Sequence, residues 1–373
     1  MDRGKERVRK MIEKGKISAS QMGKMLFLAI TPTAILTAPG ITHKFAKHDL
    51  WISPIWAFSG LIVVFLVLWL HRMYPGQSIV QACERIVGRF PGKIIGAVYW
   101  LFYLYLNGII VREYEEFVIG AFLPNTPPIV LLGSMVLVCA IAVRGGVEIV
   151  GRFADLILPV FFILFLLIIG PIIPDLHVKH MLPIMGDGIL PSIEGSLVLQ
   201  IWFSELITAS FLLPFVTDRK KAKKSMLISL SAVILTLVVS NLATLLYLGD
   251  LTGIYTYPFL ILARYINIAQ FFTHLEALFM AIWVLGAFVK ICVFYYVTVL
   301  AAAQWMNLSD YRPIVLPLGL LLTLFSIWIA PNYQEMTRAI STSVIFATLT
   351  MFVIVPILLL VIAWVKNRMR AAS

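Results

Sequence analysis

The chain has 373 residues, of which 60% are hydrophobic and 13% charged, with a formal net charge of +11. A soluble domain usually carries about twice this share of charged residues, and a disordered chain has few aromatic residues, which make up 12% here. These proportions exclude a soluble enzyme and a disordered protein, and they indicate a membrane protein.

The apolar residues cluster in runs long enough to cross a bilayer, which takes about 20 helical residues. Ten runs cover 22–42, 50–70, 94–122, 128–143, 153–173, 195–216, 226–248, 272–304, 313–330 and 339–365. Residues 61–68 are apolar at every position, unlike the alternating strands of a β-barrel. The sequence predicts an all-α polytopic membrane protein of about ten transmembrane helices. We expect one transmembrane domain over 22–366, with halves 22–173 and 191–366, between a basic tail at 1–21 and a second tail at 367–373.

Basic residues predict the orientation, because short cytoplasmic loops carry the excess of lysine and arginine. With both termini cytoplasmic, the outer side receives only Lys44, Lys47, Lys179, Arg264 and Arg338. The inner side then holds the N-terminal lysines and arginines, Arg72, Arg85, Arg89, Lys93, Arg144, Arg152, Arg219, Lys220, Lys221, Lys223, Lys224, Arg312, Lys366, Arg368 and Arg370. We expect the basic N-terminal tail to meet anionic lipid rather than nucleic acid.

The first span contains Thr31, Pro32, Thr33, Ala34 and Thr37. Proline removes a backbone donor, and a broken helix persists in a bilayer only where it lines a cavity or packs within protein. Two interpretations stay open. The helix is either broken at a binding site, or bent at the proline with threonine hydroxyls bonded to its own backbone.

The segment 78–90 follows the second span and is amphipathic. Arg85 and Arg89 lie opposite Ile79, Val80 and Ile86, so this segment is expected along the inner membrane surface.

The third span carries Asn107, Arg112, Glu113, Glu115 and Glu116. Arg112 and Glu116 are four residues apart and can pair on one helix face, whereas Glu113 points about 100° away. Glu115 and Glu116 are also compatible with an ordinary place at the outer interface, given an apolar thickness of about 30 Å.

Glu205 in the sixth span lies about ten residues into an apolar run. A charge at that depth costs at least a few kcal/mol, so it faces the bundle interior, water or a partner. Interrupted polar segments at the start of both five-helix halves mark the binding site of inverted-repeat transporters. The first and sixth spans occupy those places.

Lys290 lies centrally in the eighth span, too deep to reach the interface. It must pair with a carboxylate, replace a bound cation or lose its proton, and Glu205 and Glu113 are its candidate partners. A structural lock and a functional gate both remain open.

Other chemistry is not indicated. Cys83, Cys139 and Cys292 are scattered in or beside apolar segments, and His43/His48 and His177/His180 have no third ligand at metal spacing. Catalytic and phosphate-binding motifs are absent, so we expect no enzyme activity, metal or cofactor.

Several motifs, in order, resemble the spore germination permeases, the B subunits of nutrient germinant receptors. Residues 181–191, MLPIMGDGILP, are similar to the family's LPILGEGI.P segment. Phe203-Ser204-Glu205 followed by 212–216, LLPFV, resembles its FGE…LLPFV span. Further likeness lies at 74–78, 88–96, 264–266, 274–278 and 283–286.

The resemblance implies the five-plus-five inverted-repeat fold of the amino acid–polyamine–organocation transporters. It also implies a receptor subunit that senses an amino acid or similar nutrient, with an A subunit and a C lipoprotein as partners in the spore inner membrane. Carried over by position, the ligand-binding residues are Thr31, Thr33, Ala34, Thr37, Phe203, Ser204 and Glu205. Arg112, Glu113 and Lys290 are the expected gating or ion-pair residues.

One departure concerns the first span, where the transporters usually place glycines and this chain has Thr-Pro-Thr. Capture of a substrate carboxylate by bare amides is therefore in question. Two alternatives stay open: a proton-coupled amino-acid transporter, and a structural or channel subunit that binds no ligand of its own.

Overall fold

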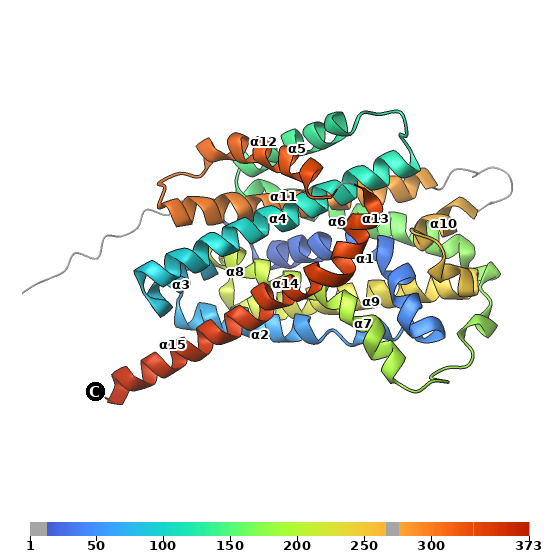
Figure 1. Cartoon of the computed structure of the whole chain (residues 1–373), viewed down its shortest axis with the longest axis horizontal. Coiled ribbons are helices and arrows are strands. Elements are labelled where there is room, and N and C mark those ends of the chain that lie inside the picture. The colour runs from blue at the N-terminus through green and yellow to red at the C-terminus, as the bar shows by residue number, and fades with distance from the viewer. Residues whose placement is uncertain (1–12, 266–275, 331, 373) are drawn as a thin grey trace, which may run out of the picture.

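The computed structural model describes residues 13–265, 276–330 and 332–372. Its α-helices are α1 Ala19–Ala46, α2 Phe58–Met73, α3 Ile79–Val87, α4 Arg89–Ala121, α5 Pro128–Arg144, α6 Val147–Ile172, α7 Leu190–Ser204, α8 Ala209–Leu212, α9 Ala222–Leu248, α10 Pro258–Tyr265, α11 Glu276–Met306, α12 Arg312–Trp328, α13 Tyr333–Ala339, α14 Ile345–Leu349 and α15 Val355–Ala372 (Figure 1). Short 3₁₀-helical segments lie at Lys47–Asp49, Ser53–Ile55, Ile173–Asp175, Val178–Met181, Glu205–Thr208, Leu213–Phe215, Arg219–Lys221 and Gly249–Gly253, and π-helical segments at Ile340–Val344 and Thr350–Ile354. Predictions for the tail residues 1–12 and for 266–275 lie outside the described residues.

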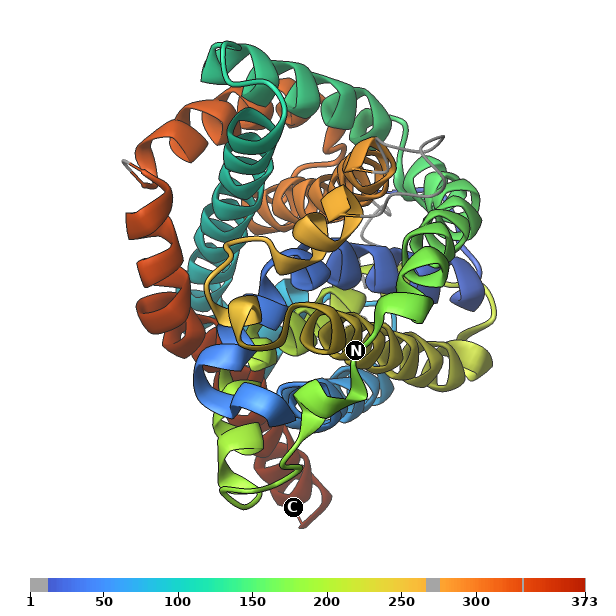
Figure 2. The ribbon, with the colours of Figure 1, turned by 90° about the vertical axis from the view of Figure 1, so that its right-hand side faces the viewer.

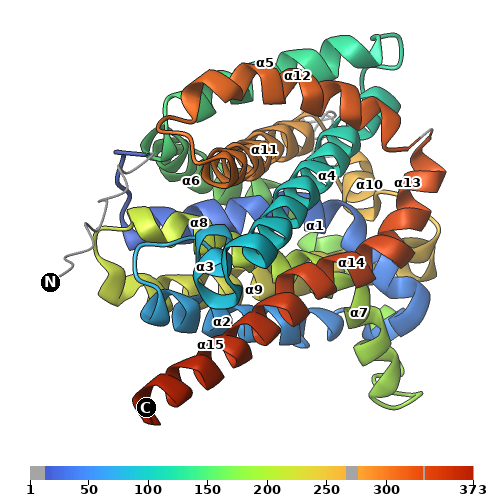
Figure 3. The same cartoon turned by 60° about the vertical axis from the view of Figure 1, so that its left-hand side comes forward.

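Helices account for all ten predicted spans. Within the described residues, eight helices are long and apolar enough to cross a membrane, and the short apolar helices α5 and α12 supply the predicted fourth and ninth spans. The last span is one stretch of helix from α13 to α15, interrupted by the two π-helical segments, and it runs diagonally across one side of the bundle (Figure 3). The chain is therefore a multi-pass membrane protein.

Local sequence explains where several helices begin. Ser18 and Gln21 form a capping box at the start of α1, and Ser78 and Gln81 form another at the start of α3. Proline occupies the first turn of α5, α7 and α12, where its missing donor costs nothing. The second span begins at Phe58, later than the apolar run that starts at residue 50, because 47–57 form short 3₁₀ segments around Pro54.

The predicted amphipathic segment is helical, as α3. Its apolar residues Ile79, Val80 and Ile86 are buried, and α3 packs against α4, α11 and α15. The apolar face of α3 therefore covers the end of the bundle itself, while Arg85 and Arg89 remain exposed.

The predicted basic segments meet at one end of the bundle. Hydrogen bonds join Ile17 to Phe215, Ala19 to Asp218, the Glu13 carboxylate to the Val147 amide and Tyr311 hydroxyl, and Lys366 to Ile86. The C-terminal end of α15 lies at this same end, on the left of Figure 1. An even number of spans therefore joins each basic segment to the next, as predicted.

The opposite end carries the longer loops, and Figure 2 looks onto it. There the His48 ring bonds the His180 carbonyl at 2.9 Å, and the Met185 amide donates to Asp49 at 2.9 Å. Arg264 donates to the Ala121 carbonyl at 3.2 Å. We call this the outer end and the basic end the inner end.

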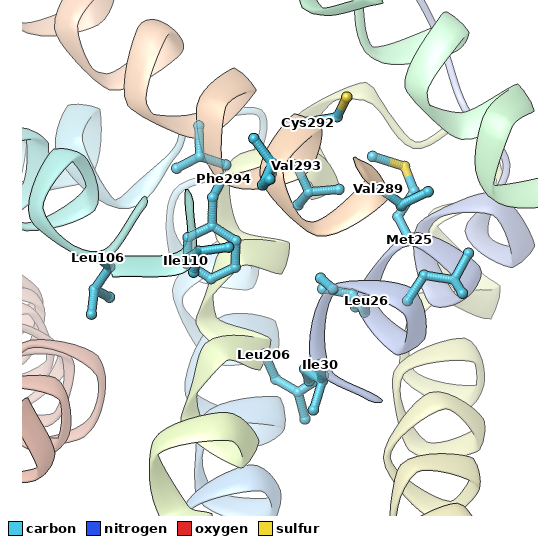
Figure 4. Packing of buried hydrophobic residues seen from close by; sticks show 14 of the residues in the cluster. Met25, Leu26, Ile30, Leu106, Ile110, Leu206, Val289, Cys292, Val293 and Phe294 are labelled. Atoms are coloured by element: carbon cyan, nitrogen blue, oxygen red, sulfur yellow. The ribbon is translucent and has the colours of Figure 1, made fainter. Parts of the chain in front are cut away.

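Helix α1 lies at the centre, in contact with α6, α7, α9 and α11, and nearly every residue along it is buried. Side chains of Ile30 from α1, Leu206 from the segment after α7, Ile110 from α4 and Phe294 from α11 converge between these helices (Figure 4). This apolar packing lies beside the buried charges, because Leu206 follows Glu205 in the chain and Lys290 Nζ lies 5.5 Å from the centroid of the Phe294 ring.

Candidate functional site

The sixth span is interrupted where the sequence predicted. Helix α7 ends at Ser204, and Glu205–Thr208 form a tighter 3₁₀ turn before the four-residue helix α8. The Ser204 hydroxyl donates to the Ile201 carbonyl at 2.7 Å, a local bond that competes with the regular helix pattern. Glu205 is the first residue of this 3₁₀ turn, and only 6% of the Glu205 surface is exposed.

The first span is not broken, which corrects one of the two interpretations left open above. Helix α1 continues through both Pro32 and Pro39. The Thr33 hydroxyl donates to the Ile30 carbonyl at 3.3 Å, and the buried helix keeps its conformation because its neighbours pack on every side. No unwound amides are therefore offered by α1 to a ligand carboxylate.

Helix α11 approaches α1 closely at Gly286, where an added Cβ would overlap the Pro32 ring. Lys290 lies one turn further along α11, and its Nζ donates to Thr33 Oγ1 at 2.8 Å. The small residue at 286 thus allows the contact that brings the ammonium group to α1.

Lys290 pairs with Glu205, one of the two candidate partners that the sequence indicated. Lys290 Nζ lies 3.0 Å from Glu205 Oε1 and 2.9 Å from Oε2, and the lysine side chain is 1% exposed. An ammonium group has three donors, so Thr33 and the two carboxylate oxygens satisfy it fully. The pair joins α1, the broken sixth span and α11 at one point.

A cavity of about 400 Å³ extends from this ion pair to the outer end. Glu113, Glu205 and Lys290 lie at its buried depth, and exposed Lys44 and Arg338 lie at its mouth. The remaining lining residues are Thr37, Gly40, Ile41, Leu106, Ile109, Ile110, Ile201, Trp202, Gly253, Ile254, Tyr255, Thr256, Gln334, Met336, Thr337, Ile340, Ser341 and Val344. The walls are thus mostly apolar, with charge at both ends.

Glu113 is the acceptor left available at depth. It is 7% exposed, lines the cavity, and receives no hydrogen bond from any side chain or amide of the described residues. A buried carboxylate with no donor is costly, so the position favours a cationic or hydrogen-bonding occupant. With one lysine and two glutamates, the depth of the cavity carries formal charge −1 and its mouth carries +2.

The structure divides the predicted site residues into two groups. Thr37, Glu113, Glu205 and Lys290 line the cavity, and Thr33 reaches it through Lys290. Buried packing instead encloses Thr31, Ala34, Phe203 and Ser204.

Arg112, unlike Glu113, does not line the cavity. Its guanidinium pairs with Glu116 at 2.5 Å, as the four-residue spacing predicted, and with Glu115 at 3.2 Å. The missed lining residues include Trp202, Lys44 and Arg338. The two cations were identified from sequence only as outer-side charges, because nothing in the sequence brings the first and last spans together.

The comparisons with known proteins agree with this architecture. The pattern of the family described as "Spore germination protein" matches residues 16–335. The chain belongs to this family. Its relatives include spore germination protein KB of Bacillus subtilis, 25% identical over 369 residues that cover 96% of this chain and 97% of the relative. Spore germination protein YndE of Bacillus subtilis is 24% identical, covering 95% of this chain and 98% of the relative.

Solved transporters share the fold. Mhp1, a nucleobase-cation-symport-1 family transporter in a closed conformation with bromovinylhydantoin bound, aligns with a TM-score of 0.65 at 11% identity, covering 91% of this chain and 77% of its own. A Na⁺-coupled sialic acid symporter in a substrate-bound outward-open state gives 0.61 at 12% identity, covering 91% and 79%. The chain therefore has the five-plus-five inverted-repeat fold of these transporters, and its family and fold are those of permeases.

Proposed function

We propose that this chain is the membrane subunit of a spore germinant receptor, which binds an amino acid or similar nutrient in the cavity and thereby triggers germination. The observation that carries the proposal is the cavity open at the outer end, where the Glu113 carboxylate, which accepts no hydrogen bond from the described residues, lies beside a buried ion pair. A volume of about 400 Å³ lies in the range of small-molecule sites. Family membership supports the role in germination.

The charge distribution suggests how a zwitterion would bind. Its ammonium group would donate to Glu113 at depth, and its carboxylate would point toward the mouth, where the positive charges of Lys44 and Arg338 favour a negative group. Charge-assisted hydrogen bonds of this kind are about twice as strong as neutral ones. Because α1 is continuous, it offers no unwound amides to a ligand carboxylate. In the proposed arrangement the cations at the mouth of the cavity favour that carboxylate instead.

Binding can trigger a change only through different affinities for two states. A ligand ammonium at Glu113 adds a positive charge near Lys290, and the ion pair of Lys290 joins α1, the sixth span and α11. We propose that occupancy shifts these three helices relative to one another and that partner subunits respond to the shift. The partners are an A subunit and a C lipoprotein, in the spore inner membrane, with both termini cytoplasmic.

The test is the germinant concentration that gives half-maximal germination of spores carrying single substitutions. Glu113→Gln should raise it about tenfold or more, since a hydrogen bond to a charged group contributes about 1.5–3 kcal/mol. Glu194→Gln is the matched control, because Glu194 is an exposed carboxylate of α7 outside the cavity. An unchanged concentration in Glu113→Gln, at equal protein level by immunoblot, would contradict ligand binding at this site.

A proton-coupled amino-acid transporter is the second candidate, favoured by the symporter fold and by the carboxylates at depth. Uptake into proteoliposomes by the purified chain alone decides between the two. Uptake that requires a pH gradient and is lost in Glu113→Gln supports the transporter. No uptake, together with the expected germination shift, supports the receptor.

A further inference from the structure

Two apolar grooves lie side by side along the inner half of α9, and their basic ends share Lys224. One groove, of about 560 Å³, lies between α1, α6 and α9, with Phe27, Leu158 and Phe162 among its walls. The other, of about 670 Å³, follows a second face of α9 as far as Leu235. Lys224, Ile228 and Ala232 line both grooves. We call these the α9 grooves.

The inner ends of both grooves are strongly basic. Lys224 lines the basic ends of both grooves, Lys220 and Lys223 line that of the second groove, and Lys24, Lys221 and Asp218 line that of the first. Among the described residues, no carboxylate lies within ion-pair distance of Lys220, Lys223 or Lys224. Lys24 and Lys221, which line the first groove, have carboxylate neighbours. Lys24 pairs with Asp155 at 2.8 Å, and Lys221 lies 3.8 Å from Asp218. Lys223 Nζ lies 5.5 Å from the centroid of the Phe65 ring, but within the described part of the chain none of the three positive charges of Lys220, Lys223 and Lys224 has a carboxylate partner.

The length and exposure of the grooves fit one leaflet of a bilayer. From Lys224 to Leu235 the helix rises about 16 Å, and half of the apolar thickness of a membrane is about 15 Å. Leu235 is 64% exposed and Ile228 is 58% exposed, so the groove walls face the surrounding lipid. With α9 crossing the membrane, the lysines lie at the depth of the phosphate groups.

We propose that the α9 grooves bind one anionic diacyl phospholipid. Its phosphate lies at Lys220, Lys223 and Lys224, and one acyl chain occupies each groove. Two apolar grooves that run side by side from adjacent basic ends, separated by the ridge of Lys224, Ile228 and Ala232, match two acyl chains that extend from a single head group. Basic pockets beside membrane helices at the cytoplasmic side commonly bind anionic head groups. A free phosphate ion would use the lysines but not the apolar walls.

The experiment measures lipid binding to the purified full-length chain by native mass spectrometry, after titration with phosphatidylglycerol or phosphatidylcholine of equal chain length. The test variant is Lys220→Gln/Lys223→Gln/Lys224→Gln. The control is Arg89→Gln/Arg144→Gln/Arg368→Gln, which removes the same charge from exposed inner-end positions outside the grooves. A third variant, Ala232→Trp, fills the shared wall with all lysines intact.

The wild-type chain and the control should retain phosphatidylglycerol in preference to phosphatidylcholine. The lysine variant should lose this preference about tenfold or more, and Ala232→Trp should also weaken retention. Displacement by inorganic phosphate, or equal loss in the control, would overturn the proposal in favour of unspecific attraction of anions. Unchanged retention in the lysine variant, or copurification of a protein segment that occupies the grooves instead of lipid, would overturn it as well.

Discussion

Removal of the Lys290 ammonium tests whether the ion pair at mid-depth stabilises the bundle. Lys290→Met keeps the length of the side chain but leaves the Glu205 carboxylate, 6% exposed, without its cation and without both of its hydrogen bonds from Nζ. Loss of one partner from a buried pair costs about 3–5 kcal/mol, because the remaining charge stays desolvated. We expect the free energy of unfolding to fall by that amount.

The double variant Lys290→Met/Glu205→Leu removes both charges together. An apolar pair in the same space is often neutral or more stable, so the double variant should recover most of the lost stability. Because Glu205→Leu alone should also cost about 3–5 kcal/mol, the loss in the double variant should be several kcal/mol smaller than the sum of the two single losses. The measurement is equilibrium unfolding in mixed detergent micelles, followed by tryptophan fluorescence.

The surface pair of Lys24 and Asp155 provides the matched control. Its N···O distance is 2.8 Å, close to that of the buried pair, but its side chains are 34% and 38% exposed. An exposed pair contributes about 0–1 kcal/mol, so Lys24→Met should have little effect. If Lys290→Met costs no more than Lys24→Met, or if the double variant loses the sum of its single changes, the buried pair does not stabilise the fold as described.

Three further outcomes are expected. Gly286→Ala should lower the free energy of unfolding by about 1–3 kcal/mol, because the added Cβ would overlap the ring of Pro32 in α1. Gly133→Ala is the control, since no atom lies within 4 Å of its added Cβ, and it should leave the free energy of unfolding unchanged. Equal effects of the two changes would refute the close packing of α1 and α11. Burial raises the pKa of the Cys83 thiol, in α3 outside the spans, to about 12. At pH 8 only about one Cys83 thiol in ten thousand is then a thiolate, the form that reacts with maleimide. In a chain whose other cysteines are replaced by alanine, maleimide should therefore label Cys83 only after unfolding. Rapid labelling of the native chain would show that α3 is not packed as described. Glu13→Gln should cost about 1–3 kcal/mol in the same unfolding measurement, because its carboxylate accepts from two backbone amides and a tyrosine hydroxyl at the inner end, and a neutral result would show that these contacts do not hold that end together.

Depth along a helix could be predicted, and it led to the central feature of the site. Lys290 and Glu205 each lie far from the ends of an apolar run, and a charge at that depth requires a partner. The Arg112–Glu116 pair followed from helical spacing alone. Both inferences depend on properties that a single helix already has.

Rotation about the helix axis and contact between distant spans could not be predicted. Glu113 and Arg112 are neighbours in sequence, yet only Glu113 faces the cavity. Lys44 and Arg338 both line the mouth although they are 294 positions apart in the sequence. The continuity of α1 through Pro32 was equally undecided, because packing by neighbouring helices sustains a helix that the local sequence alone would permit to break.

The sequence by itself determined the number of spans, their alternation across the membrane and the depth of each charge, because these depend on apolar length and on the distribution of basic residues in short loops. Only the tertiary structure decided which polar side chains share a cavity, which are enclosed in packing, and where two grooves lie side by side with lysines at their ends. The reason is physical: insertion in a bilayer depends on each helix separately, whereas a site depends on how several helices are turned toward one another by packing.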